Sequence, residues 1–204
     1  MITLVTGFGA FGGVDANPSE QLLARLAAQA RPDLRTLLLP VSFARAPHAL
    51  RKAIRTLRPE RVLALGVAPS RRVISLEKVA LNWCDARIPD NDQAQPLDQP
   101  LKRSGPDARF ARWPLSASLA RIRALGIPCE LSLSAGSFVC NAVYYGLLDA
   151  VRRRRCSALF VHVPPNAELG EGLPLELQWQ ALQALLATRD DEHAACSSAE
   201  GSIA

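Results

Sequence analysis

The sequence predicts an α/β protein, a single-domain three-layer α/β/α sandwich around a mostly parallel twisted sheet. Short apolar runs typical of buried strands alternate with amphipathic segments of about a dozen residues, the pattern of a parallel sheet covered by helices. The chain has 204 residues and 49% hydrophobic composition, which suits one domain with a sizeable core. It contains no internal repeat and no interdomain linker.

In the first half, the alternation predicts strands at residues 2–6, 34–41, 61–66 and 73–82, with helices at 18–30 and 46–57. The first helix has a clear start signal: Asn17 as N-cap, Pro18 at the first position and Glu20 at the third. The strand at 73–82 places Glu77 on one face among aliphatic neighbours. Because a buried carboxylate is costly without a partner, Glu77 either pairs with an arginine or orients a catalytic base.

In the second half, a polar stretch without periodicity at residues 83–114 predicts a long loop that is functional or mobile. Beyond it we expect a helix at 115–125, a helix that bears Cys140 in its first turn and runs to about 154, and a helix at 175–186, with strands at 128–134 and 157–163. The single domain is expected to span residues 1–187. Residues 188–204 are small and polar, and we expect a poorly ordered tail.

Composition excludes several classes of protein. Five cysteines without a C-x-x-C pair do not suggest a disulfide framework or a zinc site. The N-terminus does not resemble a signal peptide, and no apolar run could span a bilayer, so we expect a soluble cytoplasmic protein without a membrane partner. The net charge of +5 is modest, and the arginines at 152–155 complement a helix dipole. They have no interleaved aromatic residues, so no nucleic-acid partner is expected.

A glycine-rich segment at residues 7–13 contains the spacing G-x-G-x-x-G, which is typical of dinucleotide-binding loops. In that motif the helix opens within the glycines, whereas here the start signal comes later, at Asn17. The second strand also ends in Leu-Pro-Val rather than in an acidic residue. Dinucleotide binding therefore stays a distant alternative. Phe8 and Phe11, between the glycines, favour a pocket wall.

Cys140 lies at the start of a predicted helix whose apolar residues recur four apart, at Val139 and at positions 143, 147 and 151. With Ser137 as N-cap, Cys140 is the third helical residue. The free N–H groups and the helix dipole favour an anion there, so we expect this thiol to ionise more readily than a free cysteine. The alternative is a buried structural cysteine.

His162 ends the apolar strand at 157–163, which is stopped by Pro164 and Pro165. The carboxyl ends of parallel strands are where the following helices begin and where ligands bind. If the strands before Cys140 and through His162 are neighbours, thiol and imidazole converge on one side of the sheet. The alternative interpretation is that His162 is a core residue whose hydrogen bonds are satisfied within the protein.

A cysteine, a histidine and a buried glutamate form the set needed for covalent acyl transfer: Cys140 attacks a carbonyl, His162 moves the proton, and Glu77 orients the imidazole. Backbone N–H groups around Cys140 are candidates for holding the oxyanion. Arg87, in the loop after the glutamate strand, is a further candidate for that role. The alternative interpretation is that Arg87 is a solvated loop arginine with no role in catalysis.

Five blocks of the chain resemble, in order, the pyroglutamyl peptidase I (pyrrolidone carboxyl peptidase) family of cysteine peptidases. The blocks are residues 5–13 with Asn17-Pro18-Ser19, residues 74–82, residues 85–91 with Gln95-Pro96, residues 134–141 and residues 160–164. The resemblance covers the chain from residue 4 to about 186.

This resemblance implies a single α/β/α domain that removes an N-terminal pyroglutamyl residue from peptides. It assigns Cys140 as nucleophile, His162 as general acid/base and Glu77 as orienting carboxylate. It places Phe8, Phe11, Phe138 and Val139 in the substrate pocket with Asn17 nearby. Pyroglutamate is a neutral lactam, so aromatic walls suit it better than a charged clamp. The resemblance implies assembly into homotetramers. It implies no metal or organic cofactor.

The chain departs from the family pattern in two loops. Many bacterial members carry Gln-Ala-Gly-Gly-Arg where this chain has Val67-Ala-Pro-Ser-Arg71, and residues 165–168 replace a Tyr-containing sequence. Proline fixes a backbone that paired glycines leave free. Three hypotheses stay open: a pyroglutamyl peptidase, a relative whose altered loops redirect the same triad to another small amide or leave it weakly active, and a dinucleotide-binding protein.

Overall fold

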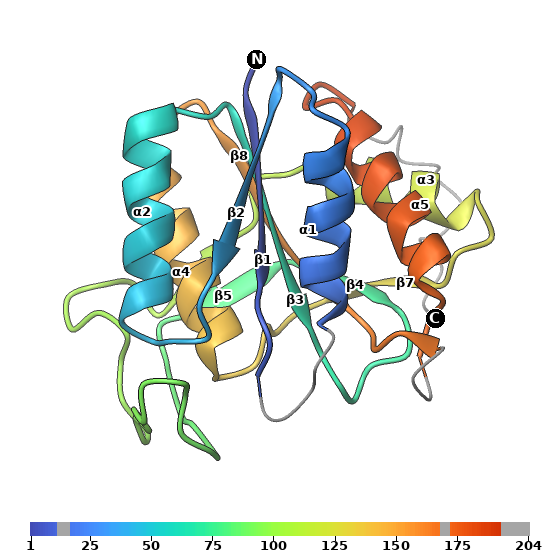
Figure 1. Ribbon diagram of the computed structural model, residues 1–204. Coiled ribbons are helices and arrows are strands. Elements are labelled where there is room, and N and C mark those ends of the chain that lie inside the picture. Colours follow the sequence, from blue (N-terminus) through green and yellow to red (C-terminus); the bar gives the residue numbers. More distant parts are fainter. Residues whose placement is uncertain (12–16, 168–171, 193–204) are drawn as a thin grey trace, which may run out of the picture.

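Buried strands and amphipathic helices alternate to form a six-stranded sheet with helices on both faces in the computed structural model, which describes residues 1–11, 17–167 and 172–192 (Figure 1). The sheet consists of β1 (Thr3–Phe8), β2 (Leu34–Leu39), β3 (Arg61–Val67), β4 (Ile74–Glu77), β7 (Cys129–Ser132) and β8 (Ser157–Val163), in the order β2-β1-β3-β8-β4-β7. A two-stranded antiparallel sheet pairs β5 (Val79–Leu81) with β6 (Ala108–Phe110).

Two hydrophobic clusters fill the space between the sheet and its helices. The helices are α1 (Pro18–Ala28), α3 (Leu115–Arg123) and α5 (Leu175–Ala187) on one face, and α2 (Arg45–Leu57) and α4 (Val139–Val151) on the other (Figure 1). Alternate residues of the central strands supply the two clusters because strand side chains point to opposite faces in turn. The predicted three-layer sandwich is confirmed.

The sheet changes direction at β8. Strands β2, β1, β3 and β8 are parallel, whereas β4 pairs antiparallel with β8 and β7 is parallel to β4. The expected pairing of the strand before Cys140 with the strand of His162 is wrong, because β4 lies between β7 and β8. Residues 68–73 carry the chain from β3 into β4 without a helix, and a connection this short cannot make a parallel crossover.

The strand expected at 73–82 is two strands in two sheets. It breaks after Glu77, at Lys78, and the chain then pairs as β5 with β6. The expected alternation therefore holds only to Glu77, which is fully buried beside Ser75 on one face. The stretch 83–114 is mostly irregular, as expected, but it contains β6 and a bridge between Cys84 and Gln99.

The start of α1 matches the prediction, and the start of α4 does not. Asn17 is the N-cap of α1, and its side chain accepts a hydrogen bond from the Ser19 backbone N–H. Phe138, rather than Ser137, is the N-cap of α4. The Ser137 hydroxyl instead donates to the Asp85 carbonyl oxygen at 2.7 Å. Cys140 is therefore the second residue of α4, and the four predicted apolar positions of this helix are all buried.

Part of the expected tail contacts the domain. Thr188 is fully buried and donates to the Ala184 carbonyl oxygen at 2.9 Å, and Asp190 pairs with the buried Arg61 at 3.4 Å. Residues 193–204 lie outside the described residues, so the boundary at 187 stays a prediction.

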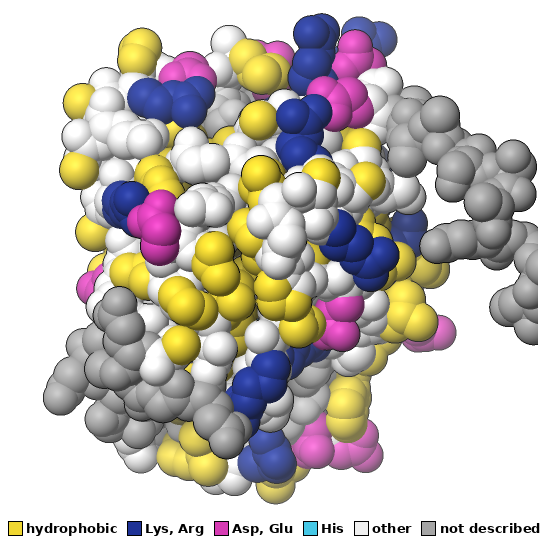
Figure 2. All heavy atoms as spheres, turned by 90° about the vertical axis from the view of Figure 1, so that its right-hand side faces the viewer, with side chains coloured by type: hydrophobic (Ala, Val, Ile, Leu, Met, Phe, Trp, Pro, Cys, Tyr) yellow, Lys and Arg dark blue, Asp and Glu magenta, His cyan; other side chains and the backbone are white. Residues whose placement is uncertain are grey.

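The face formed by α3 and α5 carries basic and acidic side chains side by side (Figure 2). Exposed ion pairs join α5 to α1, through Arg25 and Glu176, and α3 to the chain after α5, through Arg121 and Glu192. Within the described parts of the chain, none of the helices is both long and apolar enough to cross a bilayer.

Candidate active site

Three strands bring their side chains to one face of the sheet, beneath α4. Gly66 on β3 is the register partner of His162 on β8, and Phe160, two residues before His162, packs in the cluster beneath α2 and α4. Because strand side chains alternate, His162 and any side chain at position 66 share that face. Glu77 lies on it too, since its neighbour Leu76 packs in the opposite cluster.

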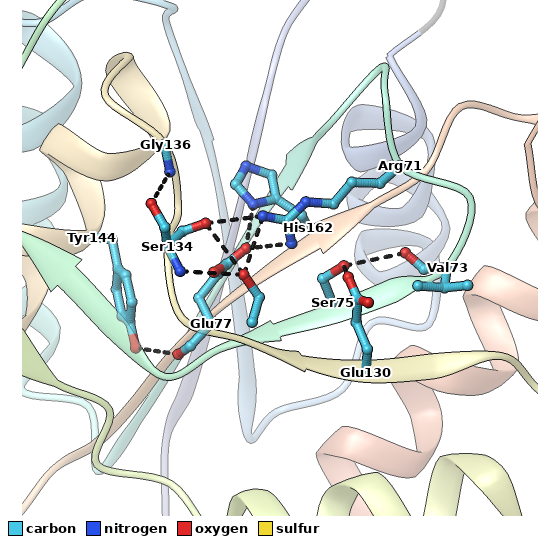
Figure 3. Close-up of polar contacts among 10 residues, drawn as sticks. Arg71, Val73, Ser75, Glu77, Glu130, Ser134, Gly136, Tyr144 and His162 are labelled. Atoms are coloured by element: carbon cyan, nitrogen blue, oxygen red, sulfur yellow. Dashed lines mark hydrogen bonds and ion pairs between the residues drawn. The ribbon is translucent and has the colours of Figure 1, made fainter.

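His162 and Glu77 form a buried pair across the boundary between β8 and β4. The His162 Nδ1 atom lies 2.7 Å from Glu77 Oε1, and the two residues are 5% and 0% exposed (Figure 3). A carboxylate at this nitrogen favours the tautomer with the proton on Nδ1. Nε2 is then the nitrogen left for proton transfer.

The Cys140 thiol reaches this face from the first turn of α4. Its Sγ atom lies 3.0 Å from the point that a Cβ atom on Gly66 would occupy. Only a residue without a side chain leaves this room. Since Gly66 stands beside His162 in the sheet, the thiol and the imidazole are on the same side, and both border one cavity. The predicted convergence is present, although Cys140 reaches it over β3.

The protonation of Cys140 differs from the expectation. Burial, together with the negative charge of Glu77, raises the pKa of the Cys140 thiol to about 12, while Arg71 and the backbone N–H of Cys140 oppose the shift. Burial also lowers the pKa of His162, against the opposing effect of Glu77. In this buried setting desolvation outweighs the helix terminus. Burial therefore favours the neutral form of both groups.

The cavity beside this pair has a volume of about 670 Å³ and a mainly apolar wall. The residues predicted to bind substrate all border it: Phe8, Phe11, Asn17, Phe138 and Val139. The Phe138 ring lies 5.4 Å from Phe11 and 5.2 Å from Phe43, centroid to centroid. Two rings of the wall, Phe11 and Phe138, therefore pack on one another, and Phe43, which does not border the cavity, packs on Phe138.

Asn17 borders the cavity and also holds the end of β1 against the start of α1 by hydrogen bonds. Its Oδ1 atom accepts from the Ser19 backbone N–H and hydroxyl, and its Nδ2 atom donates to the Gly9 carbonyl oxygen at 3.0 Å. Gly7 lies so close to α1 that a Cβ atom would stand 2.6 Å from the Ser19 carbonyl oxygen. The glycine at position 7 is therefore required for close packing on α1. Gly12 and Gly13 of the glycine motif lie outside the described residues.

Arg87 is exposed and borders the same cavity. Its loop is fixed to the start of α4: the Ser137 hydroxyl bonds the Asp85 carbonyl oxygen, and the Asn141 side chain bonds the backbone of Leu81 and Trp83. This structural role of Asn141 was not predicted from the sequence.

Arg71 is the residue near the site that the sequence analysis missed. Its Nη1 atom lies 2.7 Å from Glu77 Oε1 (Figure 3). Glu77 therefore forms the ion pair that one interpretation expected, and it also contacts His162, the histidine that the other interpretation makes the catalytic base. The orienting role of Glu77 stays a prediction. The available signal was the position of Arg71 at the end of the altered loop, but sequence spacing alone does not select this arginine.

The described cysteines, Cys84, Cys129, Cys140 and Cys156, are all free, and Cys196 lies outside the described residues. Among the residues that the structure describes, no group of three or more His, Cys, Asp or Glu side chains is arranged to hold a metal ion.

An α/β/α sandwich with a thiol and an imidazole at one cavity, and a buried carboxylate in contact with the imidazole, has the arrangement of a cysteine hydrolase. A family model described as pyroglutamyl peptidase matches residues 1–171. The pyrrolidone-carboxylate peptidase of Erwinia tasmaniensis is 42% identical over 163 residues, covering 79% of this chain and 76% of that protein. The corresponding enzyme of Vibrio vulnificus is 39% identical, with coverage of 79% and 77%.

A crystal structure of pyroglutamyl peptidase I from Bacillus amyloliquefaciens superposes with a TM-score of 0.88 at 32% identity, covering 94% of this chain and 97% of that one. The chain belongs to the pyroglutamyl peptidase family, and it is a cysteine peptidase of the pyroglutamyl peptidase I type.

Proposed function

We propose that Cys140, His162 and Glu77 are the catalytic residues with which this protein hydrolyses the bond after an N-terminal pyroglutamyl residue. As a member of this family, the protein removes N-terminal pyroglutamate from peptides. The observation that carries the residue assignment is the 2.7 Å contact between His162 Nδ1 and Glu77 Oε1, with the Cys140 thiol on the same sheet face and at the same cavity.

Because burial favours the neutral thiol and the neutral imidazole, the first proton transfer runs from Cys140 to His162. His162 Nε2 takes the thiol proton as Cys140 Sγ attacks the carbonyl carbon of pyroglutamate. The new S–C bond gives a tetrahedral oxyanion, which collapses to a thioester while the C–N bond breaks and the imidazolium protonates the departing amine. Water then attacks the thioester with His162 as base, releasing pyroglutamate and restoring the thiol. Glu77 holds the ring and stabilises the transient imidazolium.

The start of α4 suits the developing negative charge. Its first backbone N–H groups have no partner one turn earlier within the helix, and they carry the positive end of its dipole. We assign the oxyanion to these groups around Cys140. Arg87, on the rim of the cavity, is a candidate for additional charge stabilisation.

The cavity wall fits a small neutral ring. Phe8, Phe11, Phe138 and Val139 present apolar surface, and a lactam without a free amine needs no charged clamp. No metal or organic cofactor enters these steps. We further propose a homotetramer, on the strength of the family resemblance, and a cytoplasmic location, because the five cysteines do not suggest a disulfide framework.

Cleavage of a fluorogenic pyroglutamyl amide tests this function. We expect wild-type turnover that iodoacetamide abolishes, and a fall in kcat of at least about 10³-fold for Cys140→Ser, since a hydroxyl is a much weaker nucleophile at this site. Cys156→Ser is the matched control, because Cys156 is buried and free but does not border this cavity. Wild-type turnover that persists in Cys140→Ser would exclude Cys140 as nucleophile.

A second candidate function is hydrolysis of a different small amide by the same triad. Its basis is that both loops departing from the family pattern border the cavity, through Val67, Pro69, Pro165 and Asn166. Rates on amides of ring-expanded lactam acids and of open-chain acyl groups, measured beside the pyroglutamyl amide, distinguish the candidates. A higher kcat/KM for any of these than for pyroglutamyl amide would favour the second.

A further inference from the structure

We propose that Arg71 is a positioning residue of the active site, fixing the Glu77 carboxylate against His162 and joining it to the segment before Cys140. The inference rests on the proposed function, since it concerns the same histidine and glutamate. It assigns a role to a residue on the connection between β3 and β4, outside the catalytic triad proposed above.

A single oxygen of Glu77 contacts both His162 and Arg71. Oε1 lies 2.7 Å from His162 Nδ1 and 2.7 Å from Arg71 Nη1. Oε2 is buried and has no hydrogen-bond partner among the described residues. Without Arg71, the only remaining side-chain contact of this carboxylate in the described structure would be the imidazole that it has to orient. A carboxylate held at one point can rotate, and the ring would rotate with it.

Arg71 also reaches the segment that leads to Cys140. Its Nη2 atom donates to the Ser134 carbonyl oxygen at 2.9 Å (Figure 3). The same atom donates to the Ser132 hydroxyl at 3.2 Å. Ser132 ends β7, and α4 with Cys140 begins after the next six residues, 133–138. One planar guanidinium therefore joins the histidine–glutamate pair to the strand and loop before the nucleophile. Nη1 makes an ion pair with Glu77 but no hydrogen bond within the described part of the chain, while Nη2 donates to the two serines. The fork of the guanidinium places these two nitrogens on different partners, which the single ammonium of lysine does not do.

The charge of Arg71 opposes protonation of His162 and favours ionisation of Cys140. It is among the groups that lower the pKa of each of them. Among the residues that the structure describes, the charged or titratable groups around the imidazole are Glu77 from β4, Arg71 from the β3–β4 connection and Cys140 from α4, with Asp85 and Arg87 on the cavity rim. Arg71 offsets the negative charge of Glu77, so the imidazole can be oriented by a carboxylate and still be neutral.

The test compares Arg71→Met, Arg71→Lys and Ser132→Ala with wild type. For Arg71→Met we expect a fall in kcat of roughly 100-fold with KM changed by less than about threefold, because proton transfer and not substrate binding is affected. Arg71→Lys keeps the charge and should recover part of the loss. Ser132→Ala removes one acceptor of Arg71 but leaves the Glu77 contact, and its kcat should stay within about threefold of wild type.

Two measurements do not depend on the substrate. NMR titration should show a higher pKa for His162 in Arg71→Met than in wild type, with His48 on the exposed side of α2 as reference. Alkylation of Cys140 by iodoacetamide at pH 8 should slow by roughly tenfold, since the thiolate loses a favourable charge. Thermal unfolding shows whether each variant is folded. If Arg71→Met does not fold, Arg71→Lys is compared with wild type in its place.

A merely structural role for Arg71 would lower kcat in Arg71→Met and Ser132→Ala alike and leave the His162 pKa unchanged. That result, or wild-type kcat in a folded Arg71→Met, would overturn the inference. If wild type itself does not cleave pyroglutamyl amide, the proposed function fails, and the titration and alkylation results still decide the role of Arg71.

Discussion

The parallel and antiparallel parts of the sheet contribute to the site in different ways. The parallel strands β1, β3 and β8 form a continuous buried support on which His162 stands and over which Gly66 leaves room for the thiol. Strands β4 and β7, which run opposite to the other four strands and form the antiparallel part, are short, and they supply Glu77 and the route into α4. The parallel part thus determines where the reacting groups lie, and the antiparallel part determines how they are oriented.

The largest expected effect comes from the antiparallel part. Glu77→Gln keeps the shape of the side chain but removes the charge that orients and stabilises the imidazolium. We expect kcat for pyroglutamyl amide to fall by roughly 10³-fold or more, with a smaller change in KM.

The matched control for that substitution is Glu130→Gln, on the adjoining strand β7, where the exposed Glu130 side chain accepts a hydrogen bond from Ser75. Its kcat should stay within about threefold of wild type. Similar losses for the two variants would mean that β4 and β7 act only through their packing, and the proposed division between support and orientation would fail.

The next effect comes from the parallel part. In Gly66→Ala the added methyl group would lie 2.8 Å from the Phe160 ring and 3.0 Å from Cys140 Sγ, so one of them must move. Because Phe160 is fully buried, we expect a loss of about 1–3 kcal/mol in the free energy of unfolding, measured in urea. Displacement of the thiol should lower kcat by roughly 10- to 100-fold.

Gly146→Ala in α4 is the control for that change, since its methyl group would meet only Pro47, at 3.4 Å. Alanine favours the helix, so this variant should keep its activity and gain up to about 1 kcal/mol. Wild-type kcat in Gly66→Ala would show that the thiol does not depend on the space above β3.

The smallest effect is a displacement in pH dependence, and it concerns both parts of the sheet. Burial lowers the pKa of His162 below its usual 6.5, although Glu77 opposes the shift. The neutral imidazole is the base, so activity falls as acid protonates it. The acid limb of the kcat/KM profile should therefore have its midpoint below pH 6.5. A midpoint above 6.5 would mean that the carboxylate outweighs burial.

The sequence predicted the parallel part of the fold well and the antiparallel part poorly. Buried apolar runs identified β1, β3 and β8, and the Asn17-Pro18 signal identified the start of α1, because these depend on neighbouring residues. The break after Glu77, the placement of β4 between β7 and β8, and Phe138 as the cap of α4 were missed. Each depends on which distant segment pairs with the chain, and local propensity does not encode that choice.

For the site, the sequence identified the chemical groups and the structure supplied their environment. A thiol at a helix start was expected to ionise readily, but burial beside Glu77 raises the pKa of Cys140 to about 12. Desolvation depends on all the chain packed around the sulfur, which the local motif does not describe. The choice of Arg71 as the partner of Glu77, among the 24 basic residues of the chain, is likewise a result of folding.

The sequence by itself determined the family, the three-layer architecture and the identity of the three candidate catalytic residues, because motifs and apolar periodicity are local properties of the chain. The tertiary structure alone decided the direction of β4, the approach of Cys140 over Gly66 and the shared contact of Glu77 with His162 and Arg71. These features arise where segments distant in sequence meet, and their energies depend on burial and on distances that exist only in the folded chain.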